Sequence, residues 1–153
     1  MGQKQSSGYS WRRLPDRSKN PAAASRPQPV ILIVEDEDNL AELLALRLKI
    51  KQFATLIASD GHSACRLTED LLPDLILLDI MLPEMDGWEV CSFIRSHTNP
   101  QVAETPIIML SALSDMTTRY RGQAAGADAF LGKPYDFEKI FTKIDTLLDC
   151  GTG

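Results

Sequence analysis

Acidic residues, a serine and a lysine stand at the ends of the short apolar runs of this 153-residue sequence. They are Glu35 and Asp36 after VILIV, Asp79 after LILL, Ser111 after IIML, and Lys133 after AFLG. Carboxylates gathered in one site repel one another, so positive charge must compensate them. The lysine supplies one charge, and a hard divalent cation with oxygen ligands, Mg²⁺ or Mn²⁺, would supply more. The set therefore indicates a metal and phosphoryl pocket.

Each residue type suits one task in phosphoryl chemistry. A carboxylate such as Asp79 can act as a nucleophile and form an aspartyl phosphate. Ser111 can donate a hydrogen bond to a phosphoryl oxygen, and Lys133 can pair with another. Taken singly, the same residues suit simpler tasks: a turn cap, an ordinary strand end and a solvated cation. Their shared position at the ends of apolar runs favours a common site.

Alternating strands and helices must position these residues. Continuous apolar runs predict strands over 30–34, 53–58, 75–79, 106–111 and 129–133. Apolar residues at helical spacing predict helices over 40–50, 62–70, 87–96, 114–125 and 137–148. This alternation implies an α/β fold, a doubly wound five-stranded parallel sheet with helices on both faces. Ligands of such sheets bind at the carboxyl ends of the strands, where the candidate residues fall.

Local signals indicate how the chain turns at these ends. Pro83 fixes φ and Gly87 relaxes it, which predicts a sharp turn between the third strand and the next helix. Asp86 is expected to cap that helix, and Glu37 and Asp38 to cap the helix that begins near residue 39. Trp88 is then within one turn of the acidic pocket.

Composition limits the remaining possibilities. The length suits one domain, and 44% hydrophobic residues is typical of a globular protein. No apolar run approaches the roughly 18 residues of a membrane span, and the N-terminus has no apolar core of a secretory signal. The three cysteines lack metal-like spacing, which favours a reduced, cytoplasmic setting.

Charge divides the chain into two parts. Residues 1–29 hold six Lys or Arg and one Asp, so the remaining ten basic and twenty acidic residues give 30–153 a net charge of −10. We expect no nucleic-acid binding by that part. Residues 1–29 are predicted to be a disordered basic extension, and 30–150 the folded domain. Three other interpretations of the extension remain: N-myristoylation at MGQKQS, an organelle transit peptide, and contact with an acidic partner.

Four motifs carry a resemblance to a known family. VILIVEDED, LILLDIMLPEMDG, PIIMLSA and GADAFLGKP, in this order, resemble the receiver domain of two-component response regulators, the CheY-like family. The resemblance covers about residues 30–148 in register. It implies the flavodoxin-like strand order 2-1-3-4-5, for which CheY is itself a standard example. It also suggests a stand-alone single-domain response regulator, with a fragment of a longer regulator or hybrid kinase as the alternative.

The resemblance assigns the acidic residues. Asp79 would accept phosphate from a phosphohistidine of a histidine kinase or histidine phosphotransfer protein. Asp36 would hold Mg²⁺ directly and Glu35 through water, and the backbone carbonyl of Met81 would be a further ligand. The chain would then be a signalling switch that promotes its own phosphorylation and slow dephosphorylation, and not a turnover enzyme.

The resemblance also assigns the switch. Ser111 and Lys133 would bind the phosphoryl group, and the small Ala112 would let it approach. Phe130 is at the aromatic switch position, and its ring would turn inward as Ser111 moves, reshaping a face for a downstream protein. The last helix has Lys139 and Lys143 but no Arg, unlike receivers that pair through the α4-β5-α5 face in the OmpR-like group.

Two residues bear on the lifetime of the phosphorylated state and on competing functions. Met81 and Leu113 flank the attack line of water in this family, and neither can orient water, so dephosphorylation should take minutes or longer. A haloacid-dehalogenase-type phosphatase needs an acid two residues after the nucleophile, where Met81 stands. A flavodoxin-like FMN protein is disfavoured because the acidic residues 35–38 would repel its phosphate.

Overall fold

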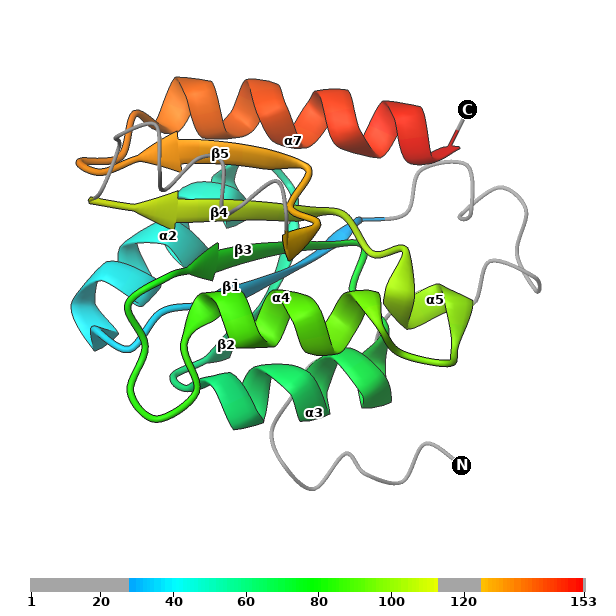
Figure 1. Ribbon diagram of the computed structural model, residues 1–153. Helices are drawn as coiled ribbons and strands as arrows, with labels where there is room; N and C mark the ends of the chain where they lie inside the picture. Colours follow the sequence, from blue (N-terminus) through cyan, green and yellow to red (C-terminus); the bar gives the residue numbers. More distant parts are fainter. Residues whose placement is uncertain (1–27, 113–124, 153) are drawn as a thin grey trace.

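The computed structural model describes residues 28–112 and 125–152 of the chain. Its elements are β1 (Val30–Val34), α2 (Asp38–Ile50), β2 (Ala54–Ala58), α3 (Gly61–Leu71), β3 (Leu75–Asp79), α4 (Gly87–Arg95), α5 (Pro100–Ala103), β4 (Ile107–Ser111), β5 (Ala129–Gly132) and α7 (Phe137–Thr152) (Figure 1). The described residues do not include Leu113, residues 114–124 of the helix expected over 114–125, or residues 1–27 of the extension expected over 1–29.

The five strands form one parallel sheet in the order β2-β1-β3-β4-β5. This confirms the predicted doubly wound α/β fold and its strand order. Because β1 pairs with both β2 and β3, the order reverses at β1, and the loops after β1 and β3 diverge at the carboxyl edge. Figure 1 shows this edge on the left, where the arrowheads of β3, β4 and β5 point.

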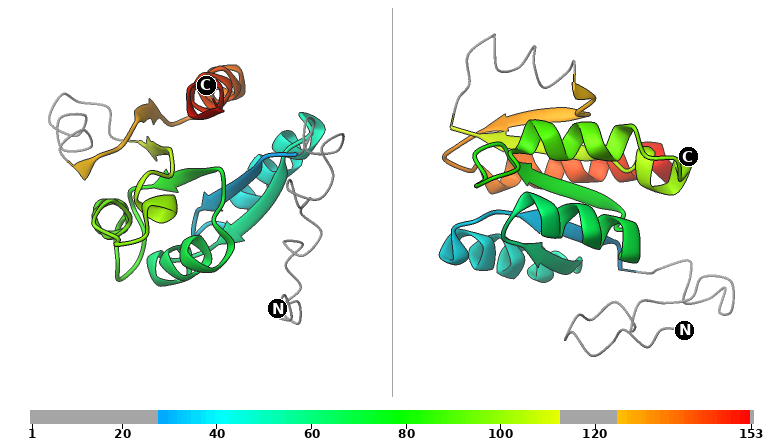
Figure 2. Two further views of the ribbon diagram at one scale, coloured as in Figure 1. Left: turned by 90° about the vertical axis from the view of Figure 1, so that its right-hand side faces the viewer. Right: turned by 60° about the horizontal axis from the view of Figure 1, so that its bottom comes forward.

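Helices cover both faces of the sheet. Side chains of α2 and α7 pack with Ile31 and Ile33 of β1 on one face, while α3 and α4 pack with Leu32 and Val34 on the other. The two views of Figure 2 show the sheet between these helix pairs. Every residue of β1, β3 and β4 is therefore buried, which explains why these strands are apolar without alternation.

The structure differs from the sequence prediction at several boundaries. The four-residue helix α5 was not predicted, although Asn99 caps it through a hydrogen bond from the backbone N–H of Gln101, and Pro100 begins it. Phe53, expected to open a strand, precedes β2, and α7 extends to Thr152, beyond the apolar repeat that ended at 148. These differences leave the carboxyl edge as predicted.

One arginine fastens the amino edge of the sheet. The guanidinium of Arg95, at the end of α4, donates to the carbonyls of Ala103, Thr105 and Gly126 and to the carboxylate of Asp128, at 2.7–2.8 Å. The same Asp128 carboxylate oxygen accepts from the backbone N–H of Ile107 at 2.8 Å. This arrangement, the Arg95 clamp, joins α4 to the beginnings of β4 and β5.

Helix α2 is apolar on two opposite faces. Its inner face buries Ala41, Leu44, Ala45 and Leu48. Its outer face carries the α2 stripe, defined as Leu43, Leu46 and Ile50, which are 42%, 55% and 68% exposed. Residues three and four apart share a helix face, so the three side chains form one continuous apolar strip on the surface.

Candidate acidic site at the carboxyl edge

The strand register brings the predicted residues together. Leu78 pairs with Val34, Asp79 with Leu110, and Ser111 with Gly132, so the next residues of β1 and β5, Glu35 and Lys133, follow at the same edge. One carboxylate oxygen from each of Glu35, Asp36 and Asp79 lies within 4.8 Å of the others. The sequence placed these residues at strand ends, and the sheet makes them neighbours.

Lys133 lies between two buried carboxylates. Glu35 and Asp79 are each 2% exposed, whereas Asp36 is exposed. The Nζ of Lys133 is 3.4 Å from Oε1 of Glu35 and 3.3 Å from Oδ2 of Asp79. Burying two charges is costly unless they are paired, and a single ammonium does not neutralise three acidic side chains.

The electrostatics of Asp79 follow from this imbalance. Burial, and next the negative charge of Glu35, raise the pKa of Asp79 to about 6, although Lys133 and the N–H of Met81 oppose the shift. Burial lowers the pKa of Lys133, but the carboxylates of Asp79 and Glu35 outweigh it, so that this pKa is raised overall. The lysine therefore stays charged, and the aspartate is a destabilised anion.

Each of the two buried carboxylates also accepts a hydrogen bond from a backbone N–H group. The N–H of Met81 donates to Oδ1 of Asp79 at 3.3 Å, and the N–H of Glu37 donates to Oε2 of Glu35 at 3.2 Å. Glu37 occupies the N-cap position of α2 but makes no capping hydrogen bond through its side chain, so its expected side-chain cap is wrong. Its contribution to the site is its backbone N–H.

The loop from Ile80 to Asp86 is closed by short backbone bonds. The N–H of Met85 donates to the carbonyl of Pro83 at 2.6 Å, and the N–H of Gly87 to that of Ile80 at 2.9 Å. Asp86 caps α4, as predicted, in a reciprocal capping box with Glu89. The loop thus returns the chain to the edge of the site at the start of α4.

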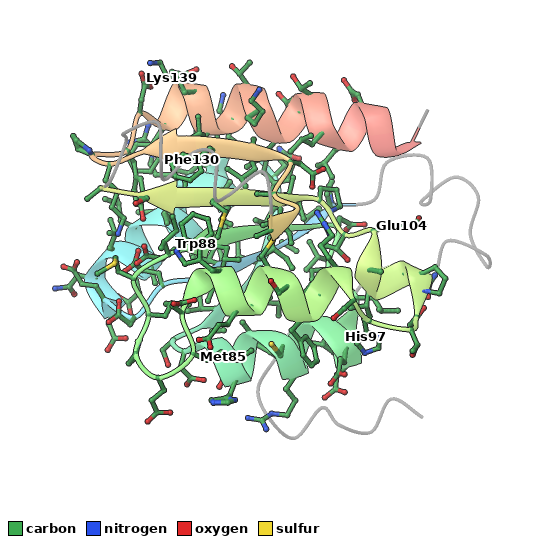
Figure 3. All side chains as sticks on the ribbon, viewed as in Figure 1. Met85, Trp88, His97, Glu104, Phe130 and Lys139 are labelled. Carbon is green, nitrogen blue, oxygen red and sulfur yellow. The ribbon has the colours of Figure 1, made fainter. Side chains whose placement is uncertain are left out.

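Ser111 and Phe130 occupy different environments. Ser111 is fully buried at the end of β4, and its carbonyl accepts from the N–H of Lys133 at 2.7 Å. Phe130 is half-buried against the core on the side of α3 and α4, as is Trp88. Figure 3 shows Trp88 at the beginning of α4 and Phe130 on β5, whereas His97 and Glu104 lie toward the opposite edge.

The family of the chain follows from comparison with known proteins. The family model for the response regulator receiver domain matches residues 31–145, most of the chain. The chain belongs to the response regulator receiver domain family. Receiver domains act in two-component signal transduction, and the acidic cluster of this one is consistent with a phospho-aspartate site.

Curated relatives of this receiver domain are longer proteins. The DNA-binding dual master transcriptional regulator RpaA of Synechocystis is 36% identical over 120 residues, covering 78% of this chain and 49% of the relative. The transcriptional regulatory protein SrrA of Staphylococcus aureus is 40% identical over 118 residues, covering 77% and 47%. The chain therefore spans about half the length of the curated relatives it matches.

Solved structures share the fold of this receiver domain. A putative response regulator from Chloroflexus aurantiacus matches with a TM-score of 0.75 and 32% identity, covering 80% of this chain and 98% of the other. Chemotaxis protein CheY4 of Vibrio cholerae matches with a TM-score of 0.73 and 25% identity, covering 78% and 98%. The CheY-like fold is thus shown independently of the sequence motifs.

The sequence prediction missed one residue of the receiver domain's acidic site. The hydroxyl of Tyr135 donates a hydrogen bond of 2.9 Å to Oε1 of Glu35. Burial, and next the charge of Glu35, raise the pKa of Tyr135, so the phenol remains protonated. The available signal was its place two residues after Lys133, close to the end of β5, which brings a polar ring to the same edge.

Proposed function

We propose that this receiver domain is a phosphoacceptor whose Asp79 takes a phosphoryl group from a phosphohistidine. A carboxylate oxygen of Asp79 forms the new O–P bond as the N–P bond breaks, and the departing imidazole takes up a proton from water. The observation that carries the proposal is the position of Asp79, held at the carboxyl edge with Lys133 3.3 Å from its Oδ2. A phosphoryl group on Asp79 would lie against that ammonium.

A divalent cation fits this site by its donor chemistry. The three carboxylates offer hard oxygen ligands within 4.8 Å of one another. The single positive charge of Lys133 does not balance their combined negative charge. Glu35, Asp36, Asp79 and the backbone carbonyl of Met81 would hold Mg²⁺ or Mn²⁺. When bound, the ion would offset the negative charge of carboxylate and phosphoryl oxygens.

Phosphorylation is proposed to act as a switch through the neighbouring strands. Ser111 and Lys133 would bind phosphoryl oxygens, with Ala112 beside them. The half-buried ring of Phe130 would then repack as Ser111 moves, and the altered surface would bind a downstream protein. The folded domain over 30–150 would carry this function, with 1–29 as a basic extension.

The α2 stripe supports a protein as the phosphodonor. Helix α2 begins two residues after Asp36, and Leu43, the first residue of the stripe, stands in the second turn of this helix. Leu43, Leu46 and Ile50 expose apolar surface that is costly in water and suits contact with another protein. A histidine kinase or histidine phosphotransfer protein docked there would present its phosphohistidine to Asp79.

A haloacid-dehalogenase-type phosphatase is the other candidate, and one observation opposes it. The position two residues after the nucleophile holds Met81, whose side chain is 64% exposed and has no proton to give. The same side chain cannot orient an attacking water. Slow hydrolysis of the phosphorylated form, over minutes or longer, is therefore expected in place of turnover.

The test is chemical phosphorylation in the absence of any kinase. The chain is incubated with acetyl phosphate and Mg²⁺, and mass spectrometry of its peptides should find one phosphoryl group on Asp79. The matched variant Asp79→Asn should carry none, and chelation of Mg²⁺ by EDTA should prevent labelling of the native chain. An unlabelled native chain, or undiminished labelling of Asp79→Asn, would refute the proposal.

A further inference from the structure

The carboxylate of Glu35 is held by three donors. Its Oε1 accepts from the hydroxyl of Tyr135 at 2.9 Å and lies 3.4 Å from the Nζ of Lys133, while its Oε2 accepts from the N–H of Glu37 at 3.2 Å. The hydroxyl makes the shortest of these contacts. Because Glu35 is almost fully buried, water has little access to replace a lost donor.

The ring that carries this hydroxyl is itself supported. Tyr135 meets Phe137 edge-on, with ring centroids 6.5 Å apart and planes at 66°. The guanidinium of Arg47, on α2, lies 4.2 Å from the ring centroid of Phe137. Tyr135 also packs against the core on the side of α2 and α7. A donor on a supported ring has a defined place, which is what orienting a carboxylate requires.

The hydroxyl also affects how Lys133 is shared. The ammonium lies 3.4 Å from Glu35 and 3.3 Å from Asp79, so neither carboxylate holds it exclusively. The hydroxyl of Tyr135 supplies one of the hydrogen bonds that the Glu35 carboxylate needs, so the ammonium of Lys133 can also pair with Asp79. Without the hydroxyl, the buried Glu35 would draw Lys133 toward itself, because a buried carboxylate that loses a donor is destabilised.

We propose that Tyr135 is a positioning residue of the acidic site: its hydroxyl fixes Glu35 for the divalent cation and keeps Lys133 shared with Asp79. This inference rests on the proposed function, since it concerns the same cation and the same phosphoacceptor. The hydroxyl acts through Glu35, to which it donates. Loss of a partner that orients a ligand typically weakens metal binding by about tenfold or more.

The test compares Mg²⁺ binding by the native chain and by Tyr135→Phe, which removes one oxygen atom and keeps the ring. Titration calorimetry of the unphosphorylated proteins should show a dissociation constant that rises by about tenfold. Labelling by acetyl phosphate should need correspondingly more Mg²⁺ for half of its maximal rate. The control Thr146→Val removes an exposed hydroxyl of α7 that lies outside the acidic site, and it should leave the Mg²⁺ dissociation constant unchanged.

A double-mutant cycle with Glu35→Gln separates positioning from packing. If the hydroxyl acts through Glu35, Tyr135→Phe should weaken Mg²⁺ binding in the native background and add no further loss in Glu35→Gln. Native Mg²⁺ affinity in Tyr135→Phe, or an equal loss in both backgrounds, would overturn the proposal. The calorimetric comparison does not depend on phosphorylation, so its outcome tests only the role of Tyr135. Failure of acetyl phosphate to label Asp79 in the native chain would instead refute the phosphoacceptor function.

Discussion

Gly87, the first residue of α4, lies against the backbone of Asp79. A Cβ on Gly87 would be 2.5 Å from the carbonyl oxygen of Asp79 and 2.7 Å from the Cα of Ile80. Real side chains do not tolerate such distances, and the opposing atoms are backbone. The absence of a side chain at this position therefore lets the start of α4 lie directly against the end of β3.

Gly87→Ala should disturb both stability and phosphorylation. The methyl group must push α4 and β3 apart, which should cost about 1–3 kcal/mol of unfolding free energy, a typical overpacking penalty. Urea unfolding should report this loss, and the rate of labelling by acetyl phosphate should fall because Asp79 is displaced. Ser92→Ala, at an exposed position of the same helix, is the control and should leave both nearly unchanged. An equally stable Gly87→Ala would contradict this account of the contact.

Asp79→Asn should stabilise the metal-free chain at neutral pH. The folded-state pKa of about 6 is above the ordinary value of 3.8. Between these values the folded state binds more protons than the unfolded state, so stability falls as pH rises and the full penalty is present above pH 6. At about 1.4 kcal/mol per pKa unit, the variant should gain about 2–3 kcal/mol at neutral pH and little at pH 4.

The measurement for Asp79→Asn is urea unfolding at several pH values in EDTA. Asp70→Asn, which changes an exposed carboxylate on α3, serves as the control and should show little gain. Adding Mg²⁺ should then stabilise the native chain more than Asp79→Asn, since ligand binding to the folded state raises the unfolding free energy. A gain in Asp79→Asn that is the same at pH 4 and pH 7 would exclude the charge of Asp79 as its cause.

Leu46→Asn should slow phosphorylation by a partner protein and leave phosphorylation by acetyl phosphate unchanged. Leu46 is the middle residue of the α2 stripe and projects away from the core, so the substitution should change stability by less than about 0.5 kcal/mol. Labelling by acetyl phosphate should be retained. Transfer from a phosphorylated histidine phosphotransfer protein should slow by about tenfold, the loss expected for an apolar residue central to an interface. Glu138→Gln on α7 is the control, and equal transfer rates would exclude the stripe as the docking surface.

Arg95→Lys should destabilise the domain despite keeping the charge. A lysine cannot reproduce the planar set of donors that reaches three carbonyls and Asp128 at once. Carbonyls left without donors should cost about 2–3 kcal/mol of unfolding free energy in total. The control is Arg66→Lys, at an exposed position of α3, and urea unfolding should show a clear difference between the two. Similar midpoints would mean that the Arg95 clamp contributes little.

The features that could be predicted from the sequence depend on residues that are close together along the chain. β1, β3 and β4 are continuous apolar runs because both faces are covered; Glu35 follows β1 directly, and Asp79 and Ser111 end β3 and β4. The capping of α4 by Asp86 is likewise a local signal. The strand order, by contrast, was taken from the family resemblance and is confirmed by the pairing of β1 with β2 and β3.

Contacts between distant residues were not predictable in this way. Tyr135 and Glu35 are 100 positions apart, and Arg95 and Asp128 are 33 apart, so no spacing in the sequence relates them. The exposed apolar face of α2 was not predicted either, because leucines on two opposite faces still fit a single helical pattern. Only the packed chain shows which leucines are buried and which are exposed.

The two edges of the sheet are held together by different kinds of contact. At the amino edge the side chain of Arg95 joins α4 to the segments that precede β4 and β5, through neutral carbonyls as well as a carboxylate. At the carboxyl edge the described side chains are joined through Lys133, which two carboxylates share, and through the hydrogen bond from Tyr135 to Glu35. We therefore expect a change of charge at Asp79 to move the loops at the carboxyl edge, while the segments bound by Arg95 at the amino edge keep their positions.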